Sequence, residues 1–470
     1  MKFDIVTYLN QLPVDILVIN ISKKNLTYLP DLSRFVNLKK LDCSYNKLTN
    51  LPPLNPELRH LYCSNNNLTQ LPPLNECLIT LDCSYNKDLI NIPKLNHGLH
   101  YLNCCHNYLE SLPELNSELL QLMCSDNCLT YLPELPNNLE YLDCNRNNLT
   151  CLPGYKLNSG LKTLLCCNNK LTTIVTLNSR LDLLYCSHNN LKCLPTLNRQ
   201  LTALECDNNN LTFIPRLNAN LQILDCSHNN LRNLPALNDD LEHLNCSHNH
   251  IIELPKINTF LTDLNCSNNL IEYLPILNEN LTSIDCSINQ LRKLPAFNYK
   301  LQRIECQHNL LTSIPALNKN LEVLECNNNK LTYLPLLNDS IRRIIFDKNP
   351  VYYMIFDNYN NPHSSDTSYE FDYFIDESYI DEFDFEHDDI VINSNPYKIY
   401  YLRNAIKTIY NFRYNYYCLK FKNTFRDFLW KKVREPKIMK RYHPSNLQKL
   451  LDSMEDKDND NELTELLNAW

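Results

Sequence analysis

Cysteine is the residue whose type and spacing could do chemistry in this chain, because 22 thiols could ligate a metal, form disulfides or act as nucleophiles. Fifteen of them recur about every twenty residues and are here called the ladder cysteines. They are Cys43, Cys63, Cys83, Cys104, Cys124, Cys144, Cys166, Cys186, Cys206, Cys226, Cys246, Cys266, Cys286, Cys306 and Cys326. A zinc site needs clustered ligands such as paired C-x-x-C, and the sequence contains none. The regular spacing favours a packing role for these thiols.

A histidine column follows the same spacing, two residues after some of the ladder cysteines. Its members are His106, His188, His228, His248 and His308. Imidazoles of neighbouring repeats, such as His228 and His248, could meet across about 5 Å and bind a metal. Asn, Tyr, Asp, Arg and Ile also occur at this position, so we interpret it as a tolerant turn position and predict neither a metal nor a cofactor. A phosphate-binding glycine loop is excluded, since the glycines stand only at 98, 154 and 160.

Each ladder cysteine belongs to a repeat that reads L-x-x-L-x-C-S-x-N-x-L-T-x-L-P-x-L-N-x-x. An asparagine stands three residues after every ladder cysteine, from Asn46 to Asn329. Altered repeats flank the run, with Ile21 and Phe346 in the cysteine position. Together these segments predict about seventeen repeats over residues 12–350, stacked side by side.

The motif resembles the leucine-rich repeat family, and its short form is similar to the bacterial-effector type with the signature LPxLPxxLxxLxVxxN. Residues 132–136 (LPELP) match the first part of that signature, whereas other repeats have Asn for the second Pro and Cys for Val. The resemblance implies an α/β repeat solenoid, a horseshoe with a parallel β-sheet on its concave side and extended, non-helical segments on its convex side. It also implies a structural ladder of asparagines. It says little about activity, because this fold carries unrelated functions.

Physical chemistry supports the same architecture. Leu41 and Cys43 alternate with polar neighbours, as in a strand with one buried face, and Pro52 excludes a helix in the second half of the repeat. One repeat alone cannot fold, since roughly 1.5–3 kcal/mol per buried side chain does not offset ~1–2 kcal/mol of backbone entropy per residue. Stacked repeats would place parallel strands about 4.8 Å apart, with reduced thiols inside rather than a disulfide framework.

The residues one and three positions before each ladder cysteine should then face outward on the concave side. We expect an apolar patch there, made of Tyr101, Met123, Tyr141, Leu165, Leu183 and Tyr185. We also expect an acidic stripe, made of Glu205, Asp225, Asp263, Asp285, Glu305 and Glu325. Exposed apolar patches often mark interaction sites, and a row of acids complements a basic partner. The alternative is that both groups are ordinary solvated strand positions.

The composition changes near residue 350. We predict an N-terminal lead over 1–11, the solenoid over 12–350, an acidic aromatic linker or cap over 351–397, and a small, mainly α-helical region over 398–470. Residues 398–443 contain thirteen Lys and Arg. They could pack as a cap on the solenoid or form a nucleic-acid surface, and the aromatic residues at helical spacing favour the cap. Residues 441–451 (RYHPSNLQKLL) are similar to tails of uncharacterised giant-virus proteins, which suggests a viral protein.

These patterns predict a non-catalytic scaffold that binds a partner protein on its concave face, with nucleic acid disfavoured as a partner. The alternative is a substrate-selecting module of an enzyme, because bacterial effectors with similar repeats carry a C-terminal ubiquitin ligase with a Cys-x-Asp nucleophile. Here Cys418 is followed by Leu419 and Lys420, so the aspartate of that motif is missing. We therefore expect no enzymatic activity.

The remaining expectations concern location and thiol access. The formal net charge is −9, the N-terminus lacks a signal-peptide pattern, and no apolar run approaches the 18 residues of a membrane span. We predict a cytoplasmic protein, in the host cytoplasm if it is viral, without membrane contact. We also expect accessible thiols outside the ladder positions, namely Cys77, Cys105, Cys128, Cys151, Cys167 and Cys193.

Overall fold

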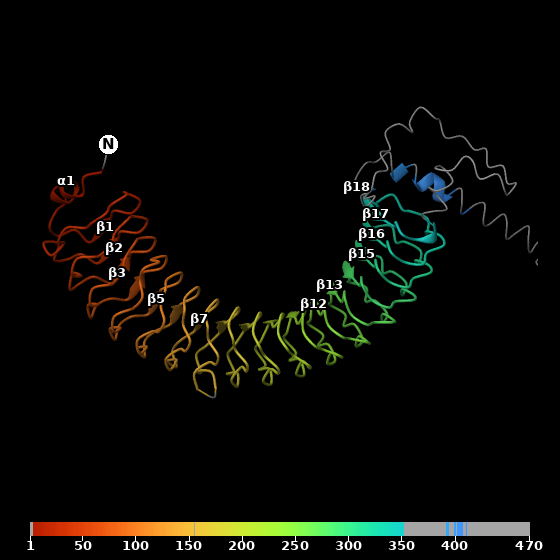
Figure 1. Ribbon diagram of the computed structural model, residues 1–470, viewed down its shortest axis with the longest axis horizontal. Coiled ribbons are helices and arrows are strands. Elements are labelled where there is room, and N and C mark those ends of the chain that lie inside the picture. The colour runs from red at the N-terminus through yellow and green to blue at the C-terminus, as the bar shows by residue number, and fades with distance from the viewer. Residues whose placement is uncertain are drawn as a thin grey trace, which may run out of the picture. The chain divides into compact units, whose positions relative to one another are not determined.

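The computed structural model describes residues 3–154, 156–351, 392–393, 399–400, 402–407 and 410. The chain divides into two compact parts, Met1–Ile399 and Tyr400–Trp470, and the named elements all lie in the first (Figure 1). These elements are α1 (Ile5–Asn10), β1 (Val18–Asn20), β2 (Lys40–Asp42), β3 (His60–Tyr62), β4 (Thr80–Asp82), β5 (Tyr101–Asn103), β6 (Gln121–Met123), β7 (Tyr141–Asp143), β8 (Thr163–Leu165), β9 (Leu183–Tyr185), β10 (Ala203–Glu205), β11 (Ile223–Asp225), β12 (His243–Asn245), β13 (Asp263–Asn265), β14 (Ser283–Asp285), β15 (Arg303–Glu305), β16 (Val323–Glu325), β17 (Arg343–Ile345) and β18 (Ile392–Asn393).

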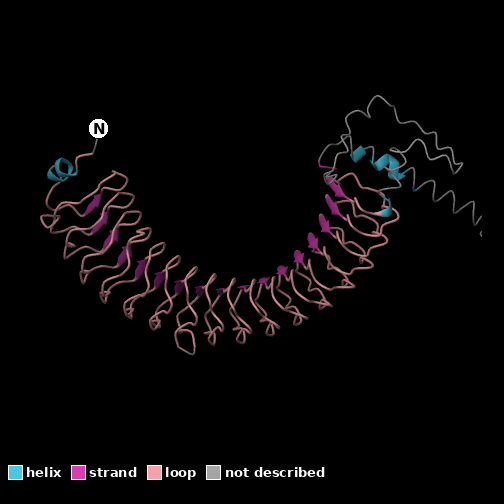
Figure 2. Cartoon of the chain, in the orientation of Figure 1, coloured by secondary structure: helices cyan, strands magenta, loops and turns pink. Residues whose placement is uncertain are grey.

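One sheet contains all the strands. Strands β1 to β17 pair in parallel in chain order, and equivalent residues of successive repeats lie side by side. The strands line the inner side of the curved solenoid and the loops form its outer side (Figure 2). No helix occurs between β1 and β17 in the residues that the structure describes there. The predicted solenoid with a parallel concave sheet and an extended convex side is confirmed.

The core is a stack of leucine and cysteine columns. All fifteen ladder cysteines are fully buried, and each strand from β1 to β17 buries its central residue, as Leu204 does in β10. The thiols add hydrogen bonds between strands, since Cys206 Sγ donates to the carbonyl oxygen of Asp225 at 3.3 Å. Burial raises the pKa of Cys43 and of Cys246 to about 12. A thiol held in this way stays protonated and unreactive near neutral pH.

The asparagine ladder connects adjacent repeats. Asn229, which is buried, donates through Nδ2 to the carbonyls of Cys226 (3.2 Å) and Ser227 (2.9 Å) in its own repeat, and to that of Cys206 (3.0 Å) in the preceding repeat. Its Oδ1 accepts from the backbone N–H of Leu211 at 2.9 Å. The amide therefore forms hydrogen bonds to the preceding repeat. It also satisfies backbone N–H and C=O groups that have no partner in the sheet.

A second ladder uses the asparagine at the end of the motif, for which the sequence pattern indicated no role. Asn278 Nδ2 donates to the carbonyl of Asn258 (2.6 Å) in the preceding repeat and to that of Leu261 (2.9 Å) at the start of its own repeat. Asn298 and Asn318 repeat this arrangement. Two rows of amides thus join the repeats, one next to the sheet and one on the returning segment.

Different devices close the two ends. Asp4 caps α1 by accepting from the backbone N–H of Val6 (3.0 Å) and Thr7 (3.3 Å), and α1 lies within the predicted N-terminal lead. At the other end, β18 pairs with β17 in the antiparallel direction. Residues 399–400, 402–407 and 410 are helical, as predicted for that region, while the rest of 398–470 and nearly all of 351–397 lie outside the described residues.

Replacing Asn229 by Ala should destabilise the solenoid, because it removes four hydrogen bonds and leaves buried backbone groups without partners. We expect the free energy of unfolding to fall by about 2–3 kcal/mol. Urea denaturation followed by circular dichroism measures this change. The neighbouring Asn230 is exposed, and only its backbone N–H is bonded, to the carbonyl of Leu211. Asn230→Ala should leave the midpoint nearly unchanged, and an equal loss in both variants would contradict the ladder's role.

Alkaline pH should destabilise the fold. Burial raises the pKa of Cys246 from an ordinary value of 9.0 to about 12, so the fold stabilises the neutral thiol. That stabilisation is complete below about pH 9 and is lost as the pH rises towards 12. Cys246→Ala should make the fall of unfolding free energy shallower by about 1.4 kcal/mol per pH unit between these values. Denaturation at pH 8 to 11 tests this. Cys193→Ala provides the control, since it removes a thiol that the fold leaves exposed.

Candidate functional site

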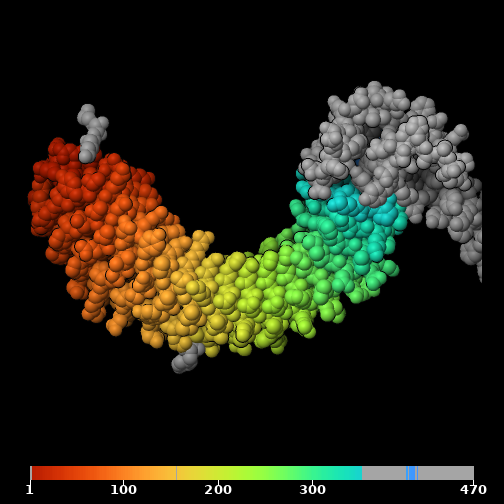
Figure 3. Space-filling view, viewed as in Figure 1, coloured from red at the N-terminus to blue at the C-terminus, as the bar shows by residue number. Residues whose placement is uncertain are grey.

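The candidate site is the concave face of the sheet, where strands β2 to β17 turn their first and third residues away from the core. These side chains are half-buried in most strands, and the central residue points into the core. In the space-filling view this side of the solenoid is hollowed along its length (Figure 3). The strand register turns the exposed positions into two parallel columns, and all twelve predicted site residues lie in these columns.

The apolar patch extends over β5 to β9, and its six members are half-buried. Tyr101 donates its hydroxyl to Met123 Sδ at 3.4 Å, which joins the two columns. Leu165 and Tyr185 are direct neighbours on β8 and β9. Burial raises the pKa of the Tyr185 hydroxyl, as it does for Tyr101 and Tyr141, so these hydroxyls remain neutral hydrogen-bonding groups.

Polar residues interrupt this patch. Gln121 separates Tyr101 from Tyr141, and Asp143 separates Met123 from Leu165. Burial raises the pKa of Asp143, and its carboxylate accepts from the backbone N–H of Asn145 at 3.1 Å. The repeat spacing places Asp143 between Met123 and Leu165 in the same column, although Asp143 was not one of the predicted patch residues. The patch therefore combines apolar surface with one half-buried carboxylate.

Two aspartates of the acidic stripe have a local structural role. Asp225 accepts from the backbone N–H (2.9 Å) and Oγ (2.7 Å) of Ser227, and Asp285 does the same with Ser287. Asp42 forms the equivalent contacts with Ser44 at the other end of the solenoid. The acid followed by serine two residues later therefore caps the end of the strand, which explains why acids recur in this column.

Two other members of the stripe are paired with arginines, and a third contacts a histidine. Glu305 Oε1 lies 2.6 Å from Arg303 Nη2, and Glu325 Oε1 lies 2.9 Å from Arg343 Nε. Asp263 Oδ2 lies 3.1 Å from His243 Nδ1. The stripe is therefore less negative at its C-terminal end than a count of its acids indicates.

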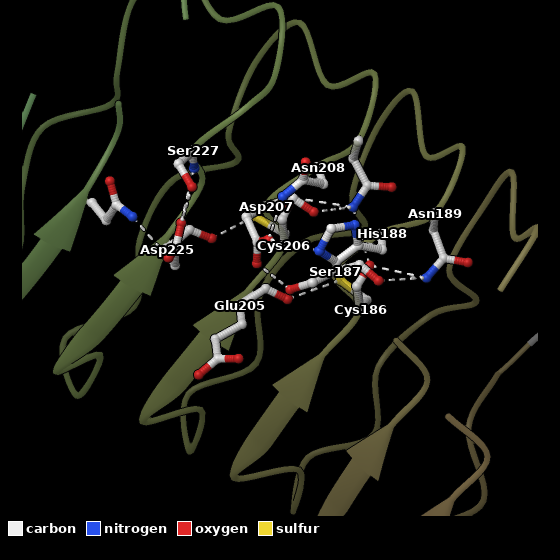
Figure 4. A network of polar contacts seen from close by, with 12 residues as sticks. Cys186, Ser187, His188, Asn189, Glu205, Cys206, Asp207, Asn208, Asp225 and Ser227 are labelled. Atoms are coloured by element: carbon white, nitrogen blue, oxygen red, sulfur yellow. Dashed lines mark hydrogen bonds and ion pairs between the residues drawn. The ribbon is translucent and has the colours of Figure 1, made fainter. Parts of the chain in front are cut away.

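Glu205 is the exception. Among the residues that the structure describes, no side chain or N–H group donates to its carboxylate and no cation pairs with it. Burial, and then the carboxylates of Asp207 and Asp225, raise its pKa. In Figure 4 the Glu205 carboxylate points away from the hydrogen-bonded network around Asp207. It is a half-buried acid without an internal counter-ion.

A groove of about 470 Å³ begins at Glu205 and continues across β11 to β15. Its lining mixes carboxylates with apolar and polar groups. The lining includes Glu205, Ile223 and Asp225 on β10 and β11, and Arg303 and Glu305 on β15. Such a groove can hold a segment of a partner that lies across the strands.

The residues of the histidine column share one backbone conformation, which the sequence interpretation of a tolerant turn position did not include. In all fifteen repeats with a ladder cysteine the residue two positions later has a φ between 49 and 56°, the left-handed region that suits Asn and Asp. His228 and His248 stack with ring centroids 4.0 Å apart and planes 11° apart. Asn268 Nδ2 lies 2.6 Å from His248 Nδ1. In the described part of the chain, no group of three or more His, Cys, Asp or Glu side chains could hold a metal ion.

The cysteines outside the ladder differ in exposure. Cys77, Cys151 and Cys193 are exposed, and Cys128 and Cys167 are half-buried. The expectation is wrong for Cys105, which is buried because its side chain lies under the next strand end and accepts from Ser125 Oγ at 3.1 Å. Cys418 lies outside the described residues. No helix in the portion of the chain that the structure describes has the length and apolar character of a membrane span.

Comparisons with known proteins agree with this architecture. The family model "Leucine Rich repeats (2 copies)" matches residues 36–76. The leucine-rich effector protein YopM from Yersinia pestis is 30% identical, over 70% of this chain and 88% of that chain, with a TM-score of 0.60. YopM from Yersinia enterocolitica is 29% identical, over 72% of this chain and 88% of that chain, with a TM-score of 0.55. A comparison with curated proteins found no match.

A third structure shares the cysteine feature. The functional domain of InlJ from Listeria monocytogenes includes a cysteine ladder, and it is 26% identical over 68% of this chain and 69% of that chain, with a TM-score of 0.50. These three neighbours are bacterial, and the viral resemblance of residues 441–451 stays a prediction. The repeat, the solenoid and the identity to YopM lead to one conclusion: the chain belongs to the leucine-rich repeat family.

Proposed function

We propose that this protein is a non-catalytic scaffold that binds a partner protein on its concave face. Leucine-rich repeat domains generally mediate protein–protein interaction, and the scaffold is typically non-catalytic. The observation that carries the proposal is the pair of columns on the concave face. Most side chains in these columns are half-exposed and do not pack in the core, so they are available for contact with a partner. They cover β5 to β15, about 50 Å at 4.8 Å per strand, which is long enough for a protein surface or an extended segment.

The composition of this face supports a protein partner. Tyr101, Tyr141 and Tyr185 offer large rings whose hydroxyls stay neutral, and tyrosine is enriched in the residues that dominate binding energy. The acids beside them oppose nucleic acid, because a phosphate backbone binds through Lys and Arg. Substrate selection for a C-terminal catalytic region, the alternative, gains no support from the described residues, since Cys418 lies outside them.

The apolar patch should be necessary for capture of the partner. The experiment uses the tagged full chain, in-cell crosslinking and mass spectrometry to identify the bound protein. Tyr141→Glu combined with Tyr185→Glu places two charges where the patch must lose water, so capture should fall by at least about tenfold. Binding is then measured with the identified partner in purified form.

The matched control is Tyr131→Glu, which introduces the same charge at an exposed tyrosine in the loop between β6 and β7. This variant should capture the partner as the unmodified chain does. Circular dichroism and the urea midpoint should be unchanged in all variants. Retained capture by a folded double variant would remove the concave face as the binding site.

A further inference from the structure

Three adjacent strands bring six side chains into a grid where the apolar patch meets the acidic stripe. One column runs Leu183, Ala203, Ile223 and the other runs Tyr185, Glu205, Asp225, on β9, β10 and β11 respectively. The strand register places Ala203 between two larger apolar residues and Glu205 between a tyrosine and a second carboxylate. The grid lies at the end of the groove that begins at Glu205.

Ala203 is covered by its neighbours in this grid. Its side chain is only 3% exposed, because Leu183 and Ile223 stand on either side of it. Ile223 is 39% exposed and so presents an unpartnered apolar wall. An aliphatic stem of a partner side chain could replace water along this wall, and that burial is favourable.

The charges in the grid are not balanced from within. Asp207, on the turn after β10, accepts from Ser187 Oγ and from Asn208 Nδ2 (2.8 Å), and lies 3.8 Å from His188 Nε2. Asp225 accepts from Ser227 and from Asn245 Nδ2 at 2.9 Å. Glu205 has no such partner among the described residues, and burial together with these two carboxylates raises its pKa. A cation from a partner protein would offset both the burial of the Glu205 carboxylate and its repulsion by the two neighbouring carboxylates.

We propose that this grid is a recognition pocket for one arginine side chain of the partner protein, with the stem against Ile223 and Leu183 and the guanidinium between Glu205 and Tyr185. The proposal rests on the proposed function and names the chemistry of its partner. Arginine fits better than lysine, because the planar guanidinium can meet a carboxylate through two donors and stack on an aromatic ring, whereas an ammonium is a compact and strongly hydrated charge. Glu305 cannot serve in the same way, since Arg303 already occupies it.

The test uses the full chain with ¹³C-labelled isoleucine methyl groups and the probe N-acetyl-arginine amide at 150 mM NaCl. We expect a saturable shift of the Ile223 methyl signal, which Ile223→Val assigns. The citrulline analogue should cause no shift and the lysine analogue should bind more weakly. Glu205→Gln keeps the shape of the side chain but removes its charge, and should weaken arginine binding by about tenfold.

Glu305→Gln is the matched control, because it makes the same charge change in the same column and should alter binding by less than about twofold. An equal loss in Glu205→Gln and Glu305→Gln, equal binding of the lysine analogue, or no saturable shift would each overturn the pocket. If the pocket fails while partner capture still depends on Tyr141 and Tyr185, the proposed function stands alone. If arginine binds as expected but partner capture does not depend on those tyrosines, the result supports the arginine pocket and contradicts the role of the apolar patch.

Discussion

The inward asparagine amide is the interaction on which the rest of the structure depends. A twenty-residue repeat has to turn sharply after a three-residue strand, and the turn passes through a left-handed residue that leaves backbone groups unpaired. Asn229 and its equivalents bond these groups within the repeat and to the preceding repeat. Because each amide holds two repeats in one register, the columns on the concave face stay aligned from strand to strand.

This alignment has an electrostatic consequence for the face. Equivalent positions become neighbours about 4.8 Å apart, so a side chain meets others that are one repeat away in the sequence. Glu205 is thereby placed beside Asp225, and Tyr185 beside Glu205. Burial, and then the carboxylates of Asp207 and Asp225, raise the pKa of Glu205, whereas Glu305 is paired with Arg303. The electrostatic environment on the concave face therefore differs strongly from strand to strand, although the repeats are nearly uniform in sequence.

The sequence predicted the architecture well because its period, its prolines and its alternation of Leu41 and Cys43 have direct structural meanings. It also placed the twelve candidate residues in the correct columns. It contains the recurring asparagine of the second amide row, such as Asn278, but did not indicate its role, since the acceptor is a backbone carbonyl that any residue type can supply. Nor did it separate Asp225, which caps a strand, from Glu205, which has no counter-ion among the described residues, because that difference arises from side-chain length and three-dimensional surroundings.

The reversed direction of β18 has a consequence for self-association. A stack of parallel strands presents the same kind of open edge at both ends, so one molecule could in principle add to the next, head to tail, and grow into a fibre. Strand β18 occupies the outer edge of β17 and runs against it, so that edge no longer offers the parallel template that β1 of another molecule would extend. Two residues of backbone are enough to change the direction of this edge.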